Sequence, residues 1–140
     1  VGLLALPGEE EAAGPPDLTI GQQTCDQCHM VISDERFAAG WRADDGTQAR
    51  FDDIGCMVAR FRSAGQPAAT LWVHDLESLA WVKAATATFV VSDAIKSPMA
   101  YGVAAFEQPG RAAAFAAENG GSSQGWDPLL QNLKWGQQNG

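Results

Sequence analysis

The six-residue segment Cys25-Asp26-Gln27-Cys28-His29-Met30 places the strongest constraint on this chain, because the fold has to gather its soft donor atoms into one site. Sulfur ligands of this kind favour Cu(I) over harder metal ions. If the backbone is extended here, residues two apart point to the same side, and the sulfurs of Cys28 and Met30 converge. The segment therefore favours a copper site.

The same segment permits two other interpretations. Residues 25–29 read C-x-x-C-H, the attachment motif of c-type haem. A C-x-x-C pair is also a thiol-disulfide exchange motif when it starts a helix next to a strand. Small haem proteins of that type are mostly helical, whereas residues 31–51 here predict a hairpin. Asp26 and Gln27 do not resemble the thioredoxin motif. A haem-binding electron-transfer protein and a thiol-disulfide redox partner remain the alternatives.

Size and charge limit the folds and partners that the chain can have. With 140 residues, 46% of them hydrophobic, the chain can form one domain with a true core. A net charge of −8 disfavours binding to nucleic acid or to an anionic membrane surface. No apolar run reaches the roughly 18 residues of a membrane-spanning helix. The three cysteines cannot all pair within the chain, so at least one thiol is free or metal-bound.

Composition divides the chain into three parts. Residues 1–20 combine an acidic run with Pro and Gly and show no apolar period, so we expect a flexible leader. Residues 21–121 carry the predicted metal-binding domain. Residues 122–140 form a tail whose apolar residues recur at spacings of three and four: Trp126, Leu129, Leu130, Leu133 and Trp135. This spacing favours a short final helix covering an exposed sheet edge, and a disordered tail is the alternative.

The first part of the domain predicts a hairpin. Residues 31–32 and 37–41 are typical of strands, and Asp45-Gly46 supplies turn chemistry before another strand at 48–51.

A helix is predicted to follow this hairpin. Asp52 and Asp53 favour its start, and Gly65 stands just beyond its expected end. Met57 shares its apolar stripe, so we expect Met57 to be a core residue, while Cys56 lies at the flank.

The second part repeats this plan in outline. It predicts strands at 71–73 and 88–91, a short amphipathic segment at 76–82 and a helix that starts near Pro109 and ends at 120–121. Each half places a methionine ahead of a strand that ends in Phe and a helix.

Met30 and Met99 are the methionines outside an evident helical stripe. Pro98 fixes the backbone before Met99, and Gly102 leaves room nearby. We therefore expect Cys25, Cys28, Met30 and Met99 to be the metal ligands. His74 alternates with Val73 at a strand end, which favours a local hydrogen bond over ligation.

These residues together resemble the NosL family. The resemblance covers roughly residues 25–121 and depends on the order and spacing of several short pieces rather than on any single one. The pieces are C-x-x-C-x-M at Cys25, Cys28 and Met30, then Phe51-Asp52-Asp53-Ile54-Gly55-Cys56, Trp72-Val73-His74-Asp75, Phe89-Val90, Pro98-Met99 with Gly102, Ala105-Phe106, and residues 113–116 followed by Gly120-Gly121.

The resemblance implies an α+β fold of two related ββα-type halves in one compact domain with a Cu(I) site. It also implies a periplasmic metallochaperone, not an enzyme, that delivers copper for assembly of a copper enzyme such as nitrous-oxide reductase. The implied partner is a copper-recipient protein or its assembly complex with an ABC transporter. A lipid anchor in the outer or inner membrane is implied by the resemblance only, since the modifiable cysteine is absent here. The family usually has glycine where this chain has His29.

Overall fold

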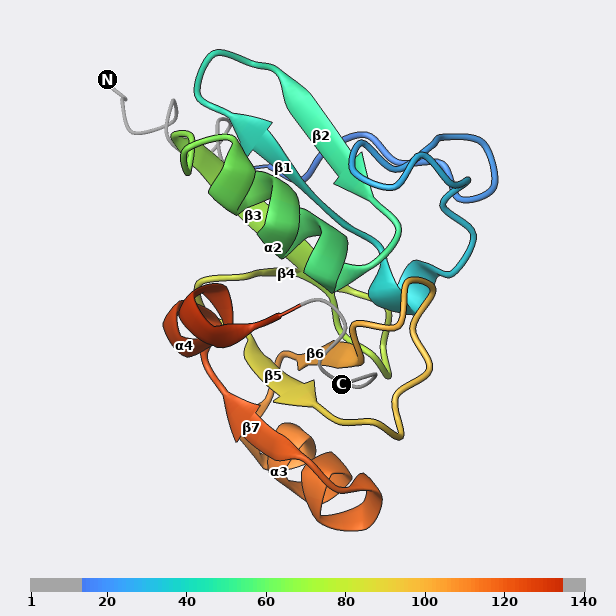
Figure 1. Cartoon of the computed structure of the whole chain (residues 1–140), viewed down its shortest axis with the longest axis vertical. Coiled ribbons are helices and arrows are strands. Elements are labelled where there is room, and N and C mark those ends of the chain that lie inside the picture. Colours follow the sequence, from blue (N-terminus) through green and yellow to red (C-terminus); the bar gives the residue numbers. More distant parts are fainter. Residues whose placement is uncertain (1–13, 135–140) are drawn as a thin grey trace, which may run out of the picture.

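The computed structural model describes residues 14–134 and shows an α+β fold built on two antiparallel sheets (Figure 1). The strand order is β2-β1-β3-β4 in the first sheet and β6-β5-β7 in the second. The elements in chain order are the 3-10 helix η2 (Glu35–Phe37), β1 (Ala39–Ala43), β2 (Gln48–Phe51), α2 (Ile54–Ser63), β3 (Ala69–His74), β4 (Trp81–Lys83), β5 (Thr88–Val91), β6 (Val103–Phe106), α3 (Pro109–Asn119), β7 (Ser122–Gln124) and α4 (Trp126–Asn132).

The two halves share one topology. In the first, β1 pairs with β2 and, after helix α2, with β3. In the second, β5 pairs with β6 and, after helix α3, with β7. Both halves are therefore ββα units that a third strand completes, and β4 is an addition to the first. The prediction of an α+β fold is confirmed.

The turn and capping residues of the first half lie where the sequence predicts them. The β1–β2 hairpin turns at Gly46, which has a φ of 92° that an L side chain rarely adopts, and the Gly46 N–H donates to the carbonyl of Ala43. Asp53 is the N-cap of α2 and accepts a hydrogen bond from the Gly55 N–H. Gly65, with a φ of 82°, follows the end of this helix.

The buried face of α2 packs against the first sheet. Met57 is completely buried there, as predicted from its apolar stripe. Trp41 of β1 makes tilted or edge contacts with Phe51 and Phe61, at 5.1 and 5.6 Å between ring centroids.

Helix α4 packs against both halves of the fold. The ring of Trp126 lies 6.3 Å from that of Phe61 in α2 and 5.9 Å from that of Phe89 in β5. Leu129 and Leu133 are buried in the same core. The predicted final helix exists, and it packs against both α2 and β5. Trp135, also assigned to it, lies outside the described residues.

Residues on either side of the expected domain, 21–121, also pack onto it. In the segment expected to be a flexible leader, residues 14–18 lie against the β1–β2 hairpin, where Arg42 donates to the carbonyls of Gly14 and Pro15. Residues 1–13 fall outside the described part. After residue 121, β7 and α4 complete the second half. No helix within the described residues is long and apolar enough to cross a membrane.

Two local predictions of secondary structure were wrong. Residues 31–32 were expected to form a strand, but they contain only an isolated bridge at Val31. Residues 76–82 were expected to form one amphipathic segment, but the chain turns there and enters β4 at Trp81. Asp75 directs this turn, because its Oδ1 accepts from the N–H groups of Glu77 and Ser78. The backbone of Leu79 then has a φ of 66°, which no helix or strand contains.

Candidate metal centre

The segment 25–30 forms a tight loop rather than an extended strand. The Cys25 N–H donates to the Met30 carbonyl, and the His29 N–H donates to the Cys25 carbonyl, at 2.8 and 2.9 Å. His29 has a left-handed φ of 68°, and an isolated bridge between Thr24 and Val31 closes the loop. The expectation that Cys28 and Met30 would converge by strand alternation was therefore wrong, because the alternation fails in a turn.

The loop docks on the end of β2. The Asp26 N–H donates to the carbonyl of Arg50, and the Asp26 carboxylate accepts from the Arg50 N–H, both at 2.8 Å. Because α2 begins three residues after β2 ends, this docking brings the first turn of the helix to the loop. Cys56 lies in that turn.

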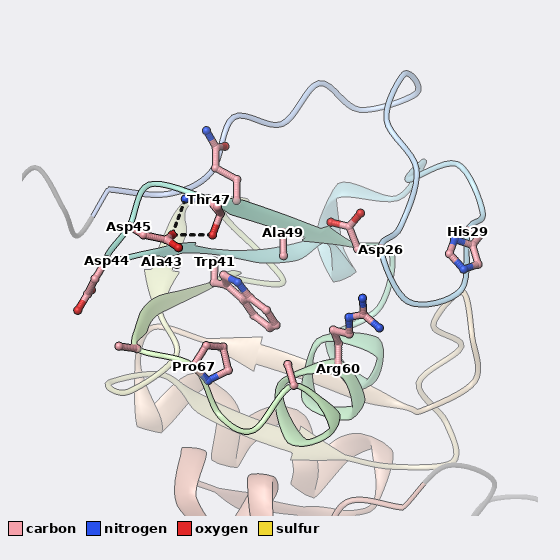
Figure 2. A pocket seen from close by; sticks show the side chains of 13 residues that line it. Asp26, His29, Trp41, Ala43, Asp44, Asp45, Thr47, Ala49, Arg60 and Pro67 are labelled. Atoms are coloured by element: carbon pink, nitrogen blue, oxygen red, sulfur yellow. Dashed lines mark hydrogen bonds between the residues drawn. The ribbon is translucent and has the colours of Figure 1, made fainter.

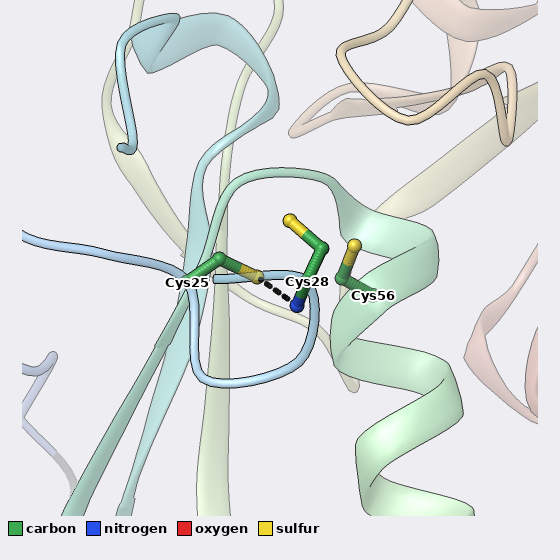
Figure 3. A group of neighbouring side chains, drawn as sticks. All are labelled: Cys25, Cys28 and Cys56. Carbon is green, nitrogen blue, oxygen red and sulfur yellow. Dashed lines mark hydrogen bonds between the residues drawn. The ribbon is translucent and has the colours of Figure 1, made fainter. Parts of the chain in front are cut away.

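Three thiols meet at the junction between the 25–30 loop and the first turn of α2. Figure 3 shows the side chains of Cys25 and Cys28, from the loop, grouped with that of Cys56, from α2. Their sulfur atoms all lie within 4.8 Å of one another, and none of the three is in a disulfide. Cys25 and Cys56 are buried, whereas Cys28 is only partly so. The cluster thus has one side that faces the surface.

The loop is built to hold a negatively charged sulfur at Cys25. The Sγ atom accepts from the backbone N–H groups of Cys28 and Gln27, at 3.3 and 3.4 Å. A hydrogen bond with the Cys56 side chain, followed by these backbone donors, lowers the pKa of Cys25 to about 5 even though burial opposes it. Burial raises the pKa of Cys28, and the bond with Cys25 raises that of Cys56. At neutral pH the cluster therefore holds one thiolate and two thiols.

Asp52 adds a second acidic group beside Cys25. It is buried, and its Oδ1 atom has no hydrogen-bond partner among the described residues. Burial, and then the charges of Cys25 and Asp53, raise the pKa of Asp52 to about 6. Negative charge without a counterion is costly in such surroundings, so the junction favours a bound cation.

The two methionines predicted as ligands occupy different positions. Met30 is 57% exposed on the loop, and its N–H donates to the Cys28 thiol. Met99 is partly buried against the core cluster that contains Cys25 and Cys56, and its N–H donates to Asp53 Oδ2 at 2.9 Å. Loop and core contacts thus bring the backbones of both residues to the junction.

The two histidines stand apart from the thiols. His29 is exposed on the loop. The buried ring of His74 donates from Nδ1 to the Ala38 carbonyl at 2.8 Å and stacks on Trp81, as expected for a residue that does not bind metal. The haem interpretation fits poorly, because a thioether bond to haem needs access to Cys25, which is completely buried beside Cys56.

A cavity of about 720 Å³ lies next to this loop, between the β1–β2 hairpin and α2 (Figure 2). Asp26 and His29 line one end, and Trp41, Asp45 and Arg60 line the rest. No thiol lines the cavity, so it is separate from the cluster.

Cys56 is the site residue that sequence reasoning did not assign. Its position off the apolar stripe predicted a place at the flank of the helix, whereas the structure buries Cys56 in the core with the stripe residues. Its approach to Cys25 depends on how the loop docks on β2, which no local pattern encodes. The odd number of cysteines was the available signal, because a C-x-x-C pair leaves one thiol to be explained.

Fold and site together define a small α+β protein with a partly open, three-thiol centre suited to a soft metal ion. A family model described as NosL matches residues 17–133, and the chain belongs to the NosL family. This assignment agrees with the expectation that the chain is not an enzyme.

A solved structure supports the fold independently. The copper chaperone NosL from Shewanella denitrificans superposes with a TM-score of 0.69 at 19% sequence identity, covering 81% of this chain and 95% of that one. No curated protein matches the chain.

Proposed function

We propose that this protein is a periplasmic Cu(I) chaperone that holds one copper ion at Cys25, Cys28 and Cys56 and passes it to a recipient protein. The observation that carries the proposal is the convergence of three sulfur atoms within 4.8 Å. The solved relative is itself a copper chaperone.

The donor set favours Cu(I) over zinc. Structural zinc sites take four nitrogen or sulfur ligands in a closed tetrahedron. The described residues offer one group of three His, Cys, Asp or Glu side chains, and all three members are thiols. Thiolate and thioether donors are soft and select Cu(I). Met99 and Met30, which were predicted as ligands, supply further thioethers, and we keep both in the proposed site.

The same geometry allows transfer. Cys28 is the most accessible of the three thiols, so a recipient's sulfur or histidine can reach the copper ion there first. Exchange then proceeds as each donor of the recipient replaces one donor of the site. A copper enzyme such as nitrous-oxide reductase, or the ABC-transporter complex that assembles it, is the recipient we propose. A lipid anchor would keep the protein at the membrane.

The test is competition for Cu(I) between the reduced protein and a chromophoric chelator in the absence of oxygen. We expect one Cu(I) per chain. Cys28→Ser and Cys56→Ser should each weaken binding strongly, with Cys28→Ser the larger loss, because thiolates are the strongest soft donors present. Met57→Ala is the matched control: it should cost about 2–5 kcal/mol of folding stability and spare copper.

Two outcomes would contradict the proposal. Unchanged affinity in Cys56→Ser would remove the three-thiol centre from the copper site. A visible haem spectrum, or a stoichiometric disulfide with no bound metal in the purified protein, would favour one of the two alternatives.

A further inference from the structure

Asp53 joins the segment that carries Met99 to the helix that carries Cys56. Its side chain is completely buried at the N-cap of α2. One carboxylate oxygen accepts from the Gly55 N–H at 3.0 Å, and the other accepts from the Met99 N–H at 2.9 Å. The second bond spans 46 residues and connects the two halves of the fold.

Further contacts fix the Met99 segment at the same point. The Ser97 hydroxyl and the Tyr101 backbone also hydrogen-bond to the Asp53 carboxylate. The Gly102 N–H donates to Ser97 Oγ at 3.0 Å, which closes residues 97–102 into a compact turn. This turn lies in the long link between β5 and β6 (Figure 1).

The turn lies directly on the first turn of α2. A Cβ atom added to Gly55 would lie 1.9 Å from Cγ of the Tyr101 ring, so glycine permits this contact and no other residue would. Cys56 follows in the next position, and burial raises the pKa of Tyr101 to about 12. The segment carrying Met99 is therefore close to the thiol cluster and held there by more than one contact.

We propose that Asp53 is a positioning residue for copper binding, which holds Met99 beside the three thiols so that the site draws donors from both halves. This inference rests on the function proposed above. Asp53 does not touch the copper ion itself. It acts through Met99, since its second oxygen bonds to the Met99 backbone.

The substitution Asp53→Asn separates the two bonds. A carboxylate can accept from Gly55 and Met99 at once, whereas an amide has one accepting oxygen and a donating NH₂ group. Asparagine is a favourable N-cap, so the variant should keep the bond to Gly55. The NH₂ group would then face the Met99 N–H, and that bond would be lost.

The experiment is a double-mutant cycle in Cu(I) affinity, measured by chelator competition on wild type, Asp53→Asn, Met99→Leu and the double variant. We expect Asp53→Asn to weaken Cu(I) binding about 10-fold or more, as for other residues that orient metal ligands. In the Met99→Leu background the same change should have no further effect, because the two residues act as one unit. A full additional loss in the double variant would overturn the proposal.

Asp75→Asn is the matched control. Asp75 is also a buried carboxylate that links the halves, since its Oδ1 accepts from Glu77 and Ser78 and its Oδ2 accepts from Glu107. None of these bonds reaches the thiol loop or the 97–102 turn. We expect Asp75→Asn to lower the apo melting temperature as Asp53→Asn does while leaving Cu(I) affinity unchanged. Equal losses of affinity in both variants would reduce Asp53 to a purely structural residue and overturn the proposal.

A milder variant covers the case in which Asp53→Asn does not fold. Ser97→Ala removes one hydroxyl from the same turn and should weaken Cu(I) binding in the wild-type background but not beside Met99→Leu. If wild type binds no Cu(I), the proposed function fails. If wild type and Met99→Leu differ while Asp53→Asn and Ser97→Ala match wild type, only the role of Asp53 fails.

Discussion

Cys25 shows how a single residue prepares this centre before a metal arrives. The thiol is completely buried, yet hydrogen bonds from Cys56 and from backbone N–H groups lower its pKa from 9.0 to about 5. Because metal binding to thiols releases protons, a site that already holds one thiolate has fewer protons to lose. The electrostatics of the loop therefore favour copper uptake at neutral pH.

The low pKa of Cys25 predicts a distinctive titration of the three thiols. In the apo protein, thiolate absorbance in the ultraviolet should show one thiol ionising near pH 5. Cys25→Ser should abolish that step, and Cys56→Ala should move it to higher pH, because the Cys56 S–H group is the largest stabilising donor. Cys28→Ser is the control that should retain it. Observation of all three thiols ionising at or above pH 9 would contradict the assignment.

The lowered pKa of Cys25 also makes folding stability depend on pH. The folded-state pKa of Cys25 lies below the unfolded value, so the ionised thiol stabilises the folded protein. This contribution is fully present above pH 9, declines as the pH falls and is lost at about pH 5. Cys25→Ser should therefore flatten the rise in apo melting temperature between these limits. Asp52 works in the opposite sense, because its pKa is raised from 3.8 to about 6 and the folded protein therefore loses stability as the pH rises between these two values.

His29 is a second residue whose backbone decides its behaviour. It has a left-handed φ of 68° and an exposed side chain. We expect His29→Gly to raise folding stability by roughly 0.5–1 kcal/mol, since glycine adopts this conformation without strain. Copper affinity should be retained, because the imidazole lies outside the thiol cluster.

Thermal or chemical unfolding of the apo protein measures the first effect, and chelator competition measures the second. Ala64→Gly, at an exposed position with a φ of −86°, is the matched control and should lose stability instead. A marked loss of Cu(I) affinity in His29→Gly would make the imidazole a ligand.

At the scale of elements, local chemistry predicted most of the fold. The Asp-Gly turn, the acidic start of α2 and the proline at the start of α3 all appear where the sequence placed them. The segment at 76–82 was missed because the side-chain caps of Asp75 outweighed a weak apolar period. The thiol pair from the loop was foreseen, whereas Cys56 required knowledge of how the loop docks on β2. Local sequence patterns carry no information about that long-range contact.

Two glycines in helices give opposite predictions. Replacing a helical glycine by alanine normally stabilises a protein by about 0.4–1 kcal/mol. Gly110 in α3 has nothing within 4 Å of an added Cβ, so Gly110→Ala should show this gain. Gly55 in α2 faces the Tyr101 ring at 1.9 Å, so Gly55→Ala should instead lower stability by more than the usual gain.

Urea unfolding of the two apo variants beside wild type measures this contrast. A gain in Gly55→Ala would show that the 97–102 turn can move away from α2 at little cost. Tyr101 would then not hold Met99 near the thiols.

The described part of the molecule is two similar ββα-based halves that share one core cluster. Helix α4 joins them through Trp126, Asp75 joins the end of β3 to the β6–α3 link, and Asp53 joins α2 to the Met99 turn. The thiols all belong to the first half, and Met99 belongs to the second. A copper ion bound by donors from both would therefore act as a further connection between the halves.

This arrangement predicts how copper changes the stability of the whole protein. A ligand that binds only the folded state stabilises it by about 2.7 kcal/mol when its free concentration is 100 times Kd. Hydrogen exchange of the reduced protein with and without Cu(I) should then show slower exchange in three segments, 25–32, 54–57 and 97–102. Met99→Leu is the control that should keep protection in the first two and lose it in the third. Two results would confine the copper site to the first half of the molecule. In one, residues 97–102 show no slower exchange in wild type with Cu(I); in the other, they remain protected in Met99→Leu.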